Sequence, residues 1–107
     1  MYRTSPGRKR KEALMKFTHV PGRNAKHRVT LYALSTCGWC RKTKELLDSN
    51  HVQYEYIDVD QCQGEERAEA SGKVRELNPR GSFPTVQVDA EVVAGFDEDR
   101  LRELLEL

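Results

Sequence analysis

Short apolar runs and longer amphipathic stretches follow one another along the chain in a regular order. Residues 28–34 form an apolar run without clean alternation, which is typical of a strand buried on both faces. Residues 52–59 form a second apolar run, and between the two runs residues 38–50 show the spacing of an amphipathic helix. A strand, a helix and a strand in this order predict parallel pairing with a right-handed crossover.

The second half of the chain predicts a helix, a hairpin and a final helix. Residues 64–77 have a helical pattern that is acidic at its start, although Gly72 weakens it. Residues 85–88 and 91–94 flank a short turn and predict an antiparallel hairpin. Asp97 is a good N-cap for the last helix. The residues of these two helices that we expect to face inward are Ala70, Val74, Leu77, Leu101, Leu104 and Leu105.

The N-terminal part differs from the rest of the chain. Residues 1–13 are rich in Arg and Lys and predict a disordered basic arm. Residues 14–20 partly alternate and could form a short strand that packs beside the next strand as an extra edge, before Pro21-Gly22 breaks it. We therefore expect the arm to be followed by a single domain over residues 14–107.

Size and charge restrict the class of protein. At 107 residues the chain allows a modest core, and no apolar run approaches the roughly 20 residues of a membrane span. No apolar stretch follows the basic N-terminus, so we expect no secretory signal and a cytoplasmic protein. Residues 1–28 contain nine Lys and Arg residues and one acidic residue. Residues 29–107 contain nine Lys and Arg residues and 16 acidic residues. Such an arm could contact nucleic acid or an acidic partner, but no aromatics interrupt its basic run, and we favour a solvated tail.

The chain has three cysteines, an odd number. A secreted disulfide scaffold more often shows an even set, so the count fits a reducing compartment, with one working pair and one further thiol. Cys62 lies in a polar loop, where we expect an incidental surface thiol whose pKa is raised by nearby acids.

Cys37-Gly38-Trp39-Cys40 places two thiols three residues apart, where the first predicted strand gives way to a helix. The spacing lets the two sulfurs close into a small ring, and the free N–H groups of a helix start favour a thiolate. Cys37, at the helix start, is therefore the expected nucleophile. Cys40, one turn into the helix, is expected to resolve the mixed disulfide by attacking Cys37.

A zinc site is the structural alternative for this pair of thiols. Zinc needs four ligands, and the only other candidates are Cys62, His19, His27 and His51. Since the chain has no second paired motif, we favour the redox interpretation and expect no bound metal ion.

The order of elements, with CxxC at the first strand–helix junction, resembles the thioredoxin fold, and residues 26–107 resemble the glutaredoxin family. The resemblance rests on the motifs Ser35-Thr36-Cys37-Gly38-Trp39-Cys40, Ser82-Phe83-Pro84-Thr85 and Gly95-Phe96-Asp97. It implies an α/β fold, with a mixed four-stranded sheet flanked by three helices. It also implies a monomeric thiol–disulfide oxidoreductase that acts on protein or small-molecule disulfides. Glutathione, another small thiol or a thioredoxin-type reductase would recycle it.

The resemblance also implies roles for residues around the thiols. The family carries a cis peptide at the position of Pro84, which would let the backbone of Phe83 pair with a substrate. The turn before the last helix would contact the γ-glutamyl end of glutathione, and Trp39 and Phe83 would form an exposed apolar docking patch. The residues expected to bind substrate or glutathione are Trp39, Phe83, Pro84, Gly95, Phe96 and Asp97.

The chain departs from the family pattern at positions that concern glutathione. Leu34 stands where many glutaredoxins have a Lys that holds a glutathione carboxylate, and Gly38 stands where Pro is usual. Phe83 replaces the common Val, Trp39 the common Tyr, and Ala94 precedes the glycine of the last turn. Relaxed versions of the Gly38 position are associated in the family with a [2Fe–2S] cluster held between two subunits. An iron–sulfur carrier, dimeric and ligated by Cys37, is therefore the alternative function.

Overall fold

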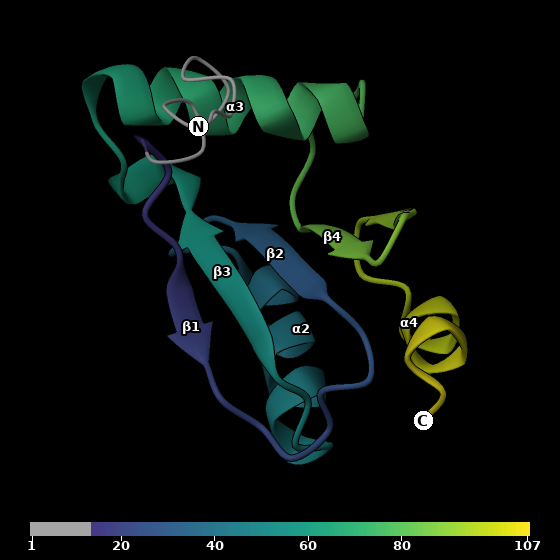
Figure 1. Ribbon diagram of the computed structural model, residues 1–107. Helices are drawn as coiled ribbons and strands as arrows, with labels where there is room; N and C mark the ends of the chain where they lie inside the picture. The colour runs from purple at the N-terminus through teal and green to yellow at the C-terminus, as the bar shows by residue number, and fades with distance from the viewer. Residues whose placement is uncertain (1–13) are drawn as a thin grey trace, which may run out of the picture.

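The structure is a computed structural model that describes residues 14–107, so the predicted arm, residues 1–13, lies outside the described residues. A five-stranded mixed sheet in the order β1-β3-β2-β4-β5 forms its centre (Figure 1). The central strand β2 (Val29–Ala33) is buried at every position, as its unbroken apolar run predicts. It pairs in parallel with β3 (Tyr54–Asp58) and antiparallel with β4 (Thr85–Val88). The edges are β1 (Thr18–Val20) and β5 (Glu91–Ala94).

Three helices cover the two faces of this sheet. Alternate residues of a strand point to opposite faces, and the buried residues of β2 accordingly divide between two core clusters. The first cluster joins the sheet to α2 (Gly38–Ser49) and α4 (Glu98–Leu105), and Figure 1 shows α2 behind the strands. The second joins the sheet to α3 (Gly64–Leu77). The sheet is thus the middle layer, with α2 and α4 on one face and α3 on the other.

The predicted elements are confirmed with small changes at their ends. The bounds of α3, β4 and β5 are those predicted, and Asp97 caps α4 by accepting a hydrogen bond from the Arg100 N–H at 3.1 Å. The second predicted strand is shorter, because residues after Asp58 turn into a one-turn 3-10 helix, η1 (Val59–Gln61). Of the residues predicted to face inward, four are buried, whereas Leu77 and Leu104 are half-buried.

The N-terminal strand exists, but its partner differs from the prediction. β1 pairs antiparallel with β3, in the register Thr18 opposite Tyr56 and Val20 opposite Tyr54, and not with the next strand in the chain. The reason is topological: β2 already has a hydrogen-bonded neighbour on each side, so the only free edge nearby is that of β3.

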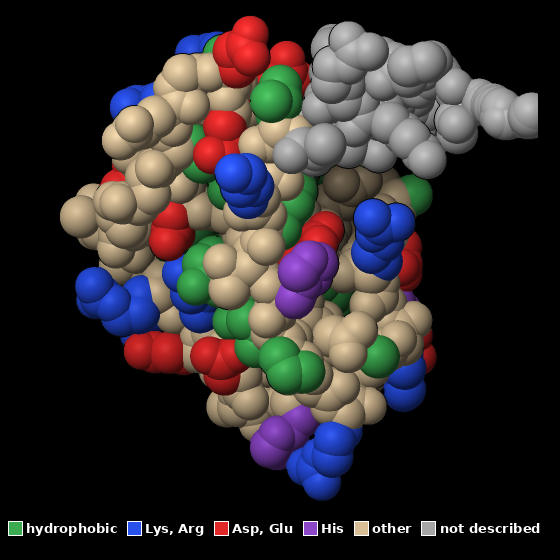
Figure 2. All heavy atoms as spheres, turned by 60° about the vertical axis from the view of Figure 1, so that its left-hand side comes forward, with side chains coloured by type: hydrophobic (Ala, Val, Ile, Leu, Met, Phe, Trp, Pro, Cys, Tyr) green, Lys and Arg blue, Asp and Glu red, His purple; other side chains and the backbone are tan. Residues whose placement is uncertain are grey.

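Two observations concern the surface. Figure 2 shows Lys and Arg side chains interspersed with Asp and Glu over the face on the β1 side. Among residues 14–107, no helix combines the length and the apolar composition that crossing a membrane requires.

Candidate active site

Cys37 lies in the turn between β2 and α2. The Cys37 N–H donates to the Leu34 carbonyl at 3.2 Å and closes this turn over Ser35 and Thr36, both of which are exposed. Cys37 then serves as the N-cap of α2, with extended backbone (φ −88°, ψ 120°), and its Sγ accepts the N–H of Cys40 at 3.2 Å. The half-buried thiol is therefore held against a free donor of the first helical turn, the arrangement in which a thiolate is stabilised.

Cys40 is the opposite kind of thiol. Its side chain is fully buried in the first core cluster, among α2 and sheet residues. Burial raises the pKa of Cys40 far above its usual value, and the hydrogen bond with Cys37 raises it further. Cys40 therefore keeps its proton while Cys37 meets the solvent, and this asymmetry is the one that the predicted roles of nucleophile and resolving thiol require. Both thiols are free.

Pro84 lies next to the turn that precedes α4. The Phe83–Pro84 peptide bond is cis, as the family resemblance implies. The Pro84 carbonyl accepts the N–H of Gly95 at 2.7 Å, and Gly95 has φ +82°, a left-handed conformation that favours glycine. Two of the predicted binding segments are thus joined by one hydrogen bond.

Phe83 is less exposed than predicted. Its side chain is half-buried and packs against both core clusters, just before β4 begins at Thr85. The prediction of Phe83 as an exposed docking group is therefore wrong for much of its ring.

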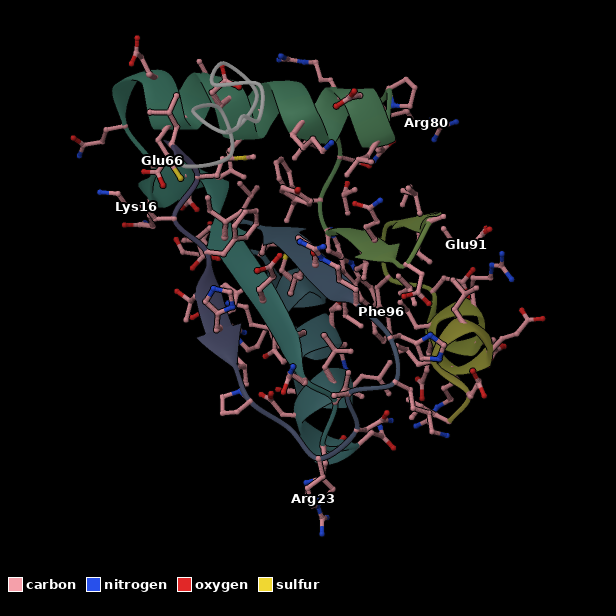
Figure 3. All side chains as sticks on the ribbon, viewed as in Figure 1. Lys16, Arg23, Glu66, Arg80, Glu91 and Phe96 are labelled. Atoms are coloured by element: carbon pink, nitrogen blue, oxygen red, sulfur yellow. The ribbon has the colours of Figure 1, made fainter. Side chains whose placement is uncertain are left out.

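Trp39 and Phe96 form an aromatic pair beside the thiols. Trp39, in the first turn of α2, is 59% exposed, and its ring stacks on that of Phe96 with centroids 5.7 Å apart and planes inclined by 20°. Phe96 lies at the start of α4, on the side toward α2 (Figure 3), and packs with Cys37 against the first core cluster. The predicted binding residues Trp39, Phe83, Pro84, Gly95, Phe96 and Asp97 therefore come from three segments that lie around one end of α2.

Asp60 is a site residue that the sequence did not reveal. Its carboxylate accepts the Ser35 N–H at 2.8 Å and the Ser35 hydroxyl at 2.5 Å, two residues before Cys37. These hydrogen bonds lower the pKa of Asp60 below its usual range. The sequence did hold a signal for this contact. Ser35 and Asp60 each directly follow a predicted strand, and the carboxyl ends of parallel neighbouring strands lie at the same edge of a sheet.

Cys62 is not the surface thiol that was predicted. It is 6% exposed and belongs to the second core cluster, and its thiol donates to the Asp58 carbonyl at 3.5 Å. The 3-10 turn η1 directs the side chain inward beneath α3, which a count of polar neighbours in the sequence could not show. Burial is the main reason that the pKa of Cys62 is raised, and the nearby acids Glu66 and Asp58 add to it.

The described residues of one chain do not complete a metal site. Within residues 14–107, no group of three or more His, Cys, Asp or Glu side chains is placed to hold a metal ion. Cys40 and Cys62 are buried in different clusters, which leaves Cys37 as the accessible thiol. A zinc ion or a [2Fe–2S] cluster needs four ligands, so three would have to come from elsewhere.

Known proteins resemble this chain over most of its length. The glutaredoxin family model matches residues 29–93. Glutaredoxin 1 of Rickettsia bellii (strain RML369-C) is 36% identical over 88 residues, which cover 75% of this chain and 88% of that protein.

Solved structures of glutaredoxins are also similar to this chain. The crystal structure of the glutaredoxin from Methanosarcina mazei Go1 is 41% identical with a TM-score of 0.77, covering 86% of this chain and 89% of that one. Methanoredoxin from Methanosarcina acetivorans is 39% identical with a TM-score of 0.74, and the match covers 78% of this chain and 88% of that one. The predicted thioredoxin-like fold is confirmed, and the family match over more than half of the sequence shows that this chain belongs to the glutaredoxin family.

Proposed function

We propose that this protein is a thiol–disulfide oxidoreductase that reduces disulfides of proteins or small molecules through Cys37 and Cys40. The observation that carries the proposal is the contrast between the two thiols. Cys37 is half-exposed at a helix N-cap, whereas Cys40 is buried, keeps its proton and points its N–H at the Cys37 sulfur.

The reaction has two exchange steps. The Cys37 thiolate attacks one sulfur of the substrate disulfide, forms a mixed disulfide and releases the other sulfur as a thiolate, which takes up a proton. Cys40 then loses its proton and attacks the Cys37 sulfur, releasing the second substrate thiol. The substrate gains two electrons, and the protein is left with a Cys37–Cys40 disulfide.

The surroundings of the thiols suit a substrate that lies across the end of α2. The stacked rings of Trp39 and Phe96 offer an apolar wall, and in this proposal the backbone of Phe83 pairs with an extended substrate segment, as the family resemblance implies. Gly95 and Asp97 would receive glutathione if that thiol recycles the protein. Leu34 cannot supply the positive charge that many relatives use for a glutathione carboxylate, so a thioredoxin-type reductase is the other candidate reductant.

Cysteine variants test the chemistry. Cys37→Ser should abolish the reduction of bis(2-hydroxyethyl) disulfide, since no other accessible thiol can start the exchange. Cys40→Ser should accumulate mixed disulfides that mass spectrometry detects on Cys37. Cys62→Ala is the matched control, because this thiol is buried outside the site, and it should retain activity. Retained turnover in Cys37→Ser would refute the assignment.

The electron source and the cluster alternative need their own measurement. Wild-type turnover with glutathione plus its reductase should be compared with turnover with thioredoxin reductase. The protein should also be purified without oxygen. We expect a colourless monomer that is active with one of the two electron sources. A brown dimer with visible absorbance, lost in Cys37→Ser, would support the iron–sulfur carrier instead.

A further inference from the structure

The turn that presents Cys37 is bound from outside by the side chains of Asp60 and Gln61. Asp60, in η1, accepts both the N–H and the hydroxyl of Ser35, and the Gln61 side-chain amide donates to the Ser35 hydroxyl at 3.1 Å and to Asp60 at 3.3 Å. The two segments lie 25 residues apart in the sequence. They form a small polar network on the surface, where β2 and β3 end side by side.

At Ser35 and Thr36 little else holds the turn in place. Both residues and Gly38 are exposed, and Gly38 has no neighbouring atom that a Cβ would meet, whereas Cys37 packs against the first core cluster and Trp39 stacks on Phe96. In the described part of the chain, the hydrogen bonds that join Ser35 and Thr36 to another element all end on Asp60 or Gln61. The backbone hydrogen bond from Cys37 to Leu34 closes the turn but does not attach it to the rest of the domain.

We propose that Asp60 is a positioning residue for Cys37: by binding Ser35 it fixes the turn in which the Cys37 sulfur caps α2 and accepts the Cys40 N–H. Asp60 does not touch the reacting sulfurs. The proposal rests on the proposed function, in that Cys37 is taken as the attacking thiol.

The carboxylate has two opposing effects on Cys37, and geometry should outweigh charge. The hydrogen bonds from Ser35 keep Asp60 ionised at neutral pH, and charge-assisted bonds of this kind are stronger than neutral ones. A nearby negative charge disfavours a thiolate, but between exposed groups water and salt screen this repulsion. Loss of the turn geometry removes a capping hydrogen bond outright. An Asn at position 60 separates the two effects, because it can still bind Ser35 but carries no charge.

The test is the rate at which iodoacetamide alkylates Cys37 in the reduced, folded protein, followed by mass spectrometry from about pH 5 to 10. We expect Asp60→Ala to slow alkylation about fivefold at neutral pH and to shift the rate profile to higher pH, because about 1 kcal/mol of thiolate stabilisation is lost. Ser35→Ala should have a smaller effect, since its backbone N–H still reaches Asp60. Asp60→Asn should stay within about twofold of the wild type.

A double mutant and a matched control make the result specific. Asp60→Ala with Ser35→Ala should be slower than Asp60→Ala alone by less than the effect of Ser35→Ala by itself, because the two side chains share a contact and only the Gln61 hydrogen bond to Ser35 remains to be lost. Asp89→Ala is the matched control. Asp89 also accepts a backbone N–H, that of Arg28 at 2.9 Å, and binds a side chain, that of His27, but it lies in the β4–β5 turn. It should leave the profile unchanged.

Three outcomes would overturn the proposal: wild-type alkylation in Asp60→Ala, additive effects in the double mutant, or an equal effect of Asp89→Ala. Thermal unfolding of each variant, measured beforehand, shows that the assay temperature lies below its transition. Alkylation needs no disulfide substrate, so its result stands even if Cys37→Ser keeps reductase activity. Failure here and failure of the proposed function are therefore distinguishable.

Discussion

Trp39 is the most exposed large apolar side chain in the described part of the chain. Its exposure is 59%, and the other exposed large apolar residue there is Leu107, at 39%. Trp39 is also ordered, because Phe96 stacks against its ring. An apolar ring that is held rigid beside the proposed nucleophile Cys37 loses little conformational entropy when a partner covers it, which suits a substrate contact.

Replacement of Trp39 by Ala should weaken substrate binding without changing the chemistry. We expect the KM for a protein disulfide to rise about threefold to tenfold, since an aromatic contact contributes about 0.5–1.5 kcal/mol, while kcat stays nearly constant. Steady-state kinetics in which the concentration of the disulfide-bonded protein substrate is varied measures both constants. Leu107→Ala is the control and should change neither. An unchanged KM in Trp39→Ala would remove this ring from the substrate contact.

In the loop after β1, Gly22 lies directly against the backbone of the connection between α2 and β3. A Cβ on Gly22 would lie 2.5 Å from the His51 carbonyl oxygen and 2.7 Å from the Gln53 nitrogen, both of them backbone atoms that cannot rotate away. Next to it, Asn24 exchanges two backbone hydrogen bonds of 2.9 Å with His51 and Gln53. This loop therefore fastens the N-terminal segment to the connection between α2 and β3.

Two glycine-to-alanine variants should change stability in opposite directions. Gly22→Ala should lower the free energy of unfolding by about 1–3 kcal/mol, because the backbone must move to admit a methyl group. Gly72→Ala, in the interior of α3 with open space around its Cα, should raise it by about 0.5–1 kcal/mol through helix propensity. Urea denaturation measures both. Equal effects of the two changes would contradict the close approach at Gly22.

His27 joins three segments near the C-terminal end of the chain. Its Nδ1 lies 2.6 Å from Asp89 in the β4–β5 turn, and its Nε2 lies 2.9 Å from Glu106 at the end of α4. The hydrogen bond to Asp89, and then that to Glu106, raise the pKa of His27, while the pKa of Asp89 is lowered by its hydrogen bonds to Arg28 and His27. The imidazole thus ties α4 to the hairpin and to the loop before β2, and these contacts favour its charged form.

The contribution of this contact to stability should depend on pH. Because the pKa of His27 is raised on folding, its contribution is complete below about pH 6.5, the unfolded value, and is lost as the pH rises through the higher folded value. The contribution of Asp89 is present above about pH 4 and is lost as the pH falls through its lowered pKa. The Tm difference between wild type and His27→Gln should therefore be largest near pH 5–6.5 and shrink as the pH rises through the raised pKa of His27. A difference that grows with pH would contradict the charged contact.

Residues 14–28 lie before the region that the family model matches, yet they pack against it. β1 adds a fifth strand to the sheet, and the Lys16 N–H donates to the Glu66 carboxylate of α3 at 2.7 Å (Figure 3). Phe17 packs edge-on against the buried ring of Tyr32, with centroids 5.9 Å apart. The extension thus covers the edge of β3 and part of the second core cluster.

Two truncations distinguish the arm from the extension. Removal of residues 1–28 should lower the free energy of unfolding by about 2–4 kcal/mol, because Met15, Phe17 and Val20 no longer bury apolar surface and the β3 edge is left unpaired. Removal of residues 1–13 should leave reductase activity unchanged, since every contact described for the site lies within residues 14–107. Calorimetry and the disulfide assay measure the two effects. Equal stability of the two truncated proteins would show that β1 contributes nothing.

The order of elements and the thiol pair followed from local patterns. The buried run of β2, the amphipathic spacing of α2 and the position of Cys37 and Cys40 between them are properties of about 20 neighbouring residues, which periodicity and capping chemistry describe well. The same holds for the hairpin and for Asp97 as the cap of α4.

Other features depended on contacts between distant segments. The partner of β1, the burial of Cys62, the two-sided packing of Phe83 and the hydrogen bonds of Ser35 with Asp60 all join residues that local pattern cannot relate. His27 meets Glu106 across 79 positions. Periodicity assigns a residue to an element and a face, but the topology of the sheet decides which face or edge lies opposite. The thiol pair and its place at a helix start could therefore be predicted from the sequence, whereas the contacts that Ser35 makes with Asp60 depend on the tertiary structure.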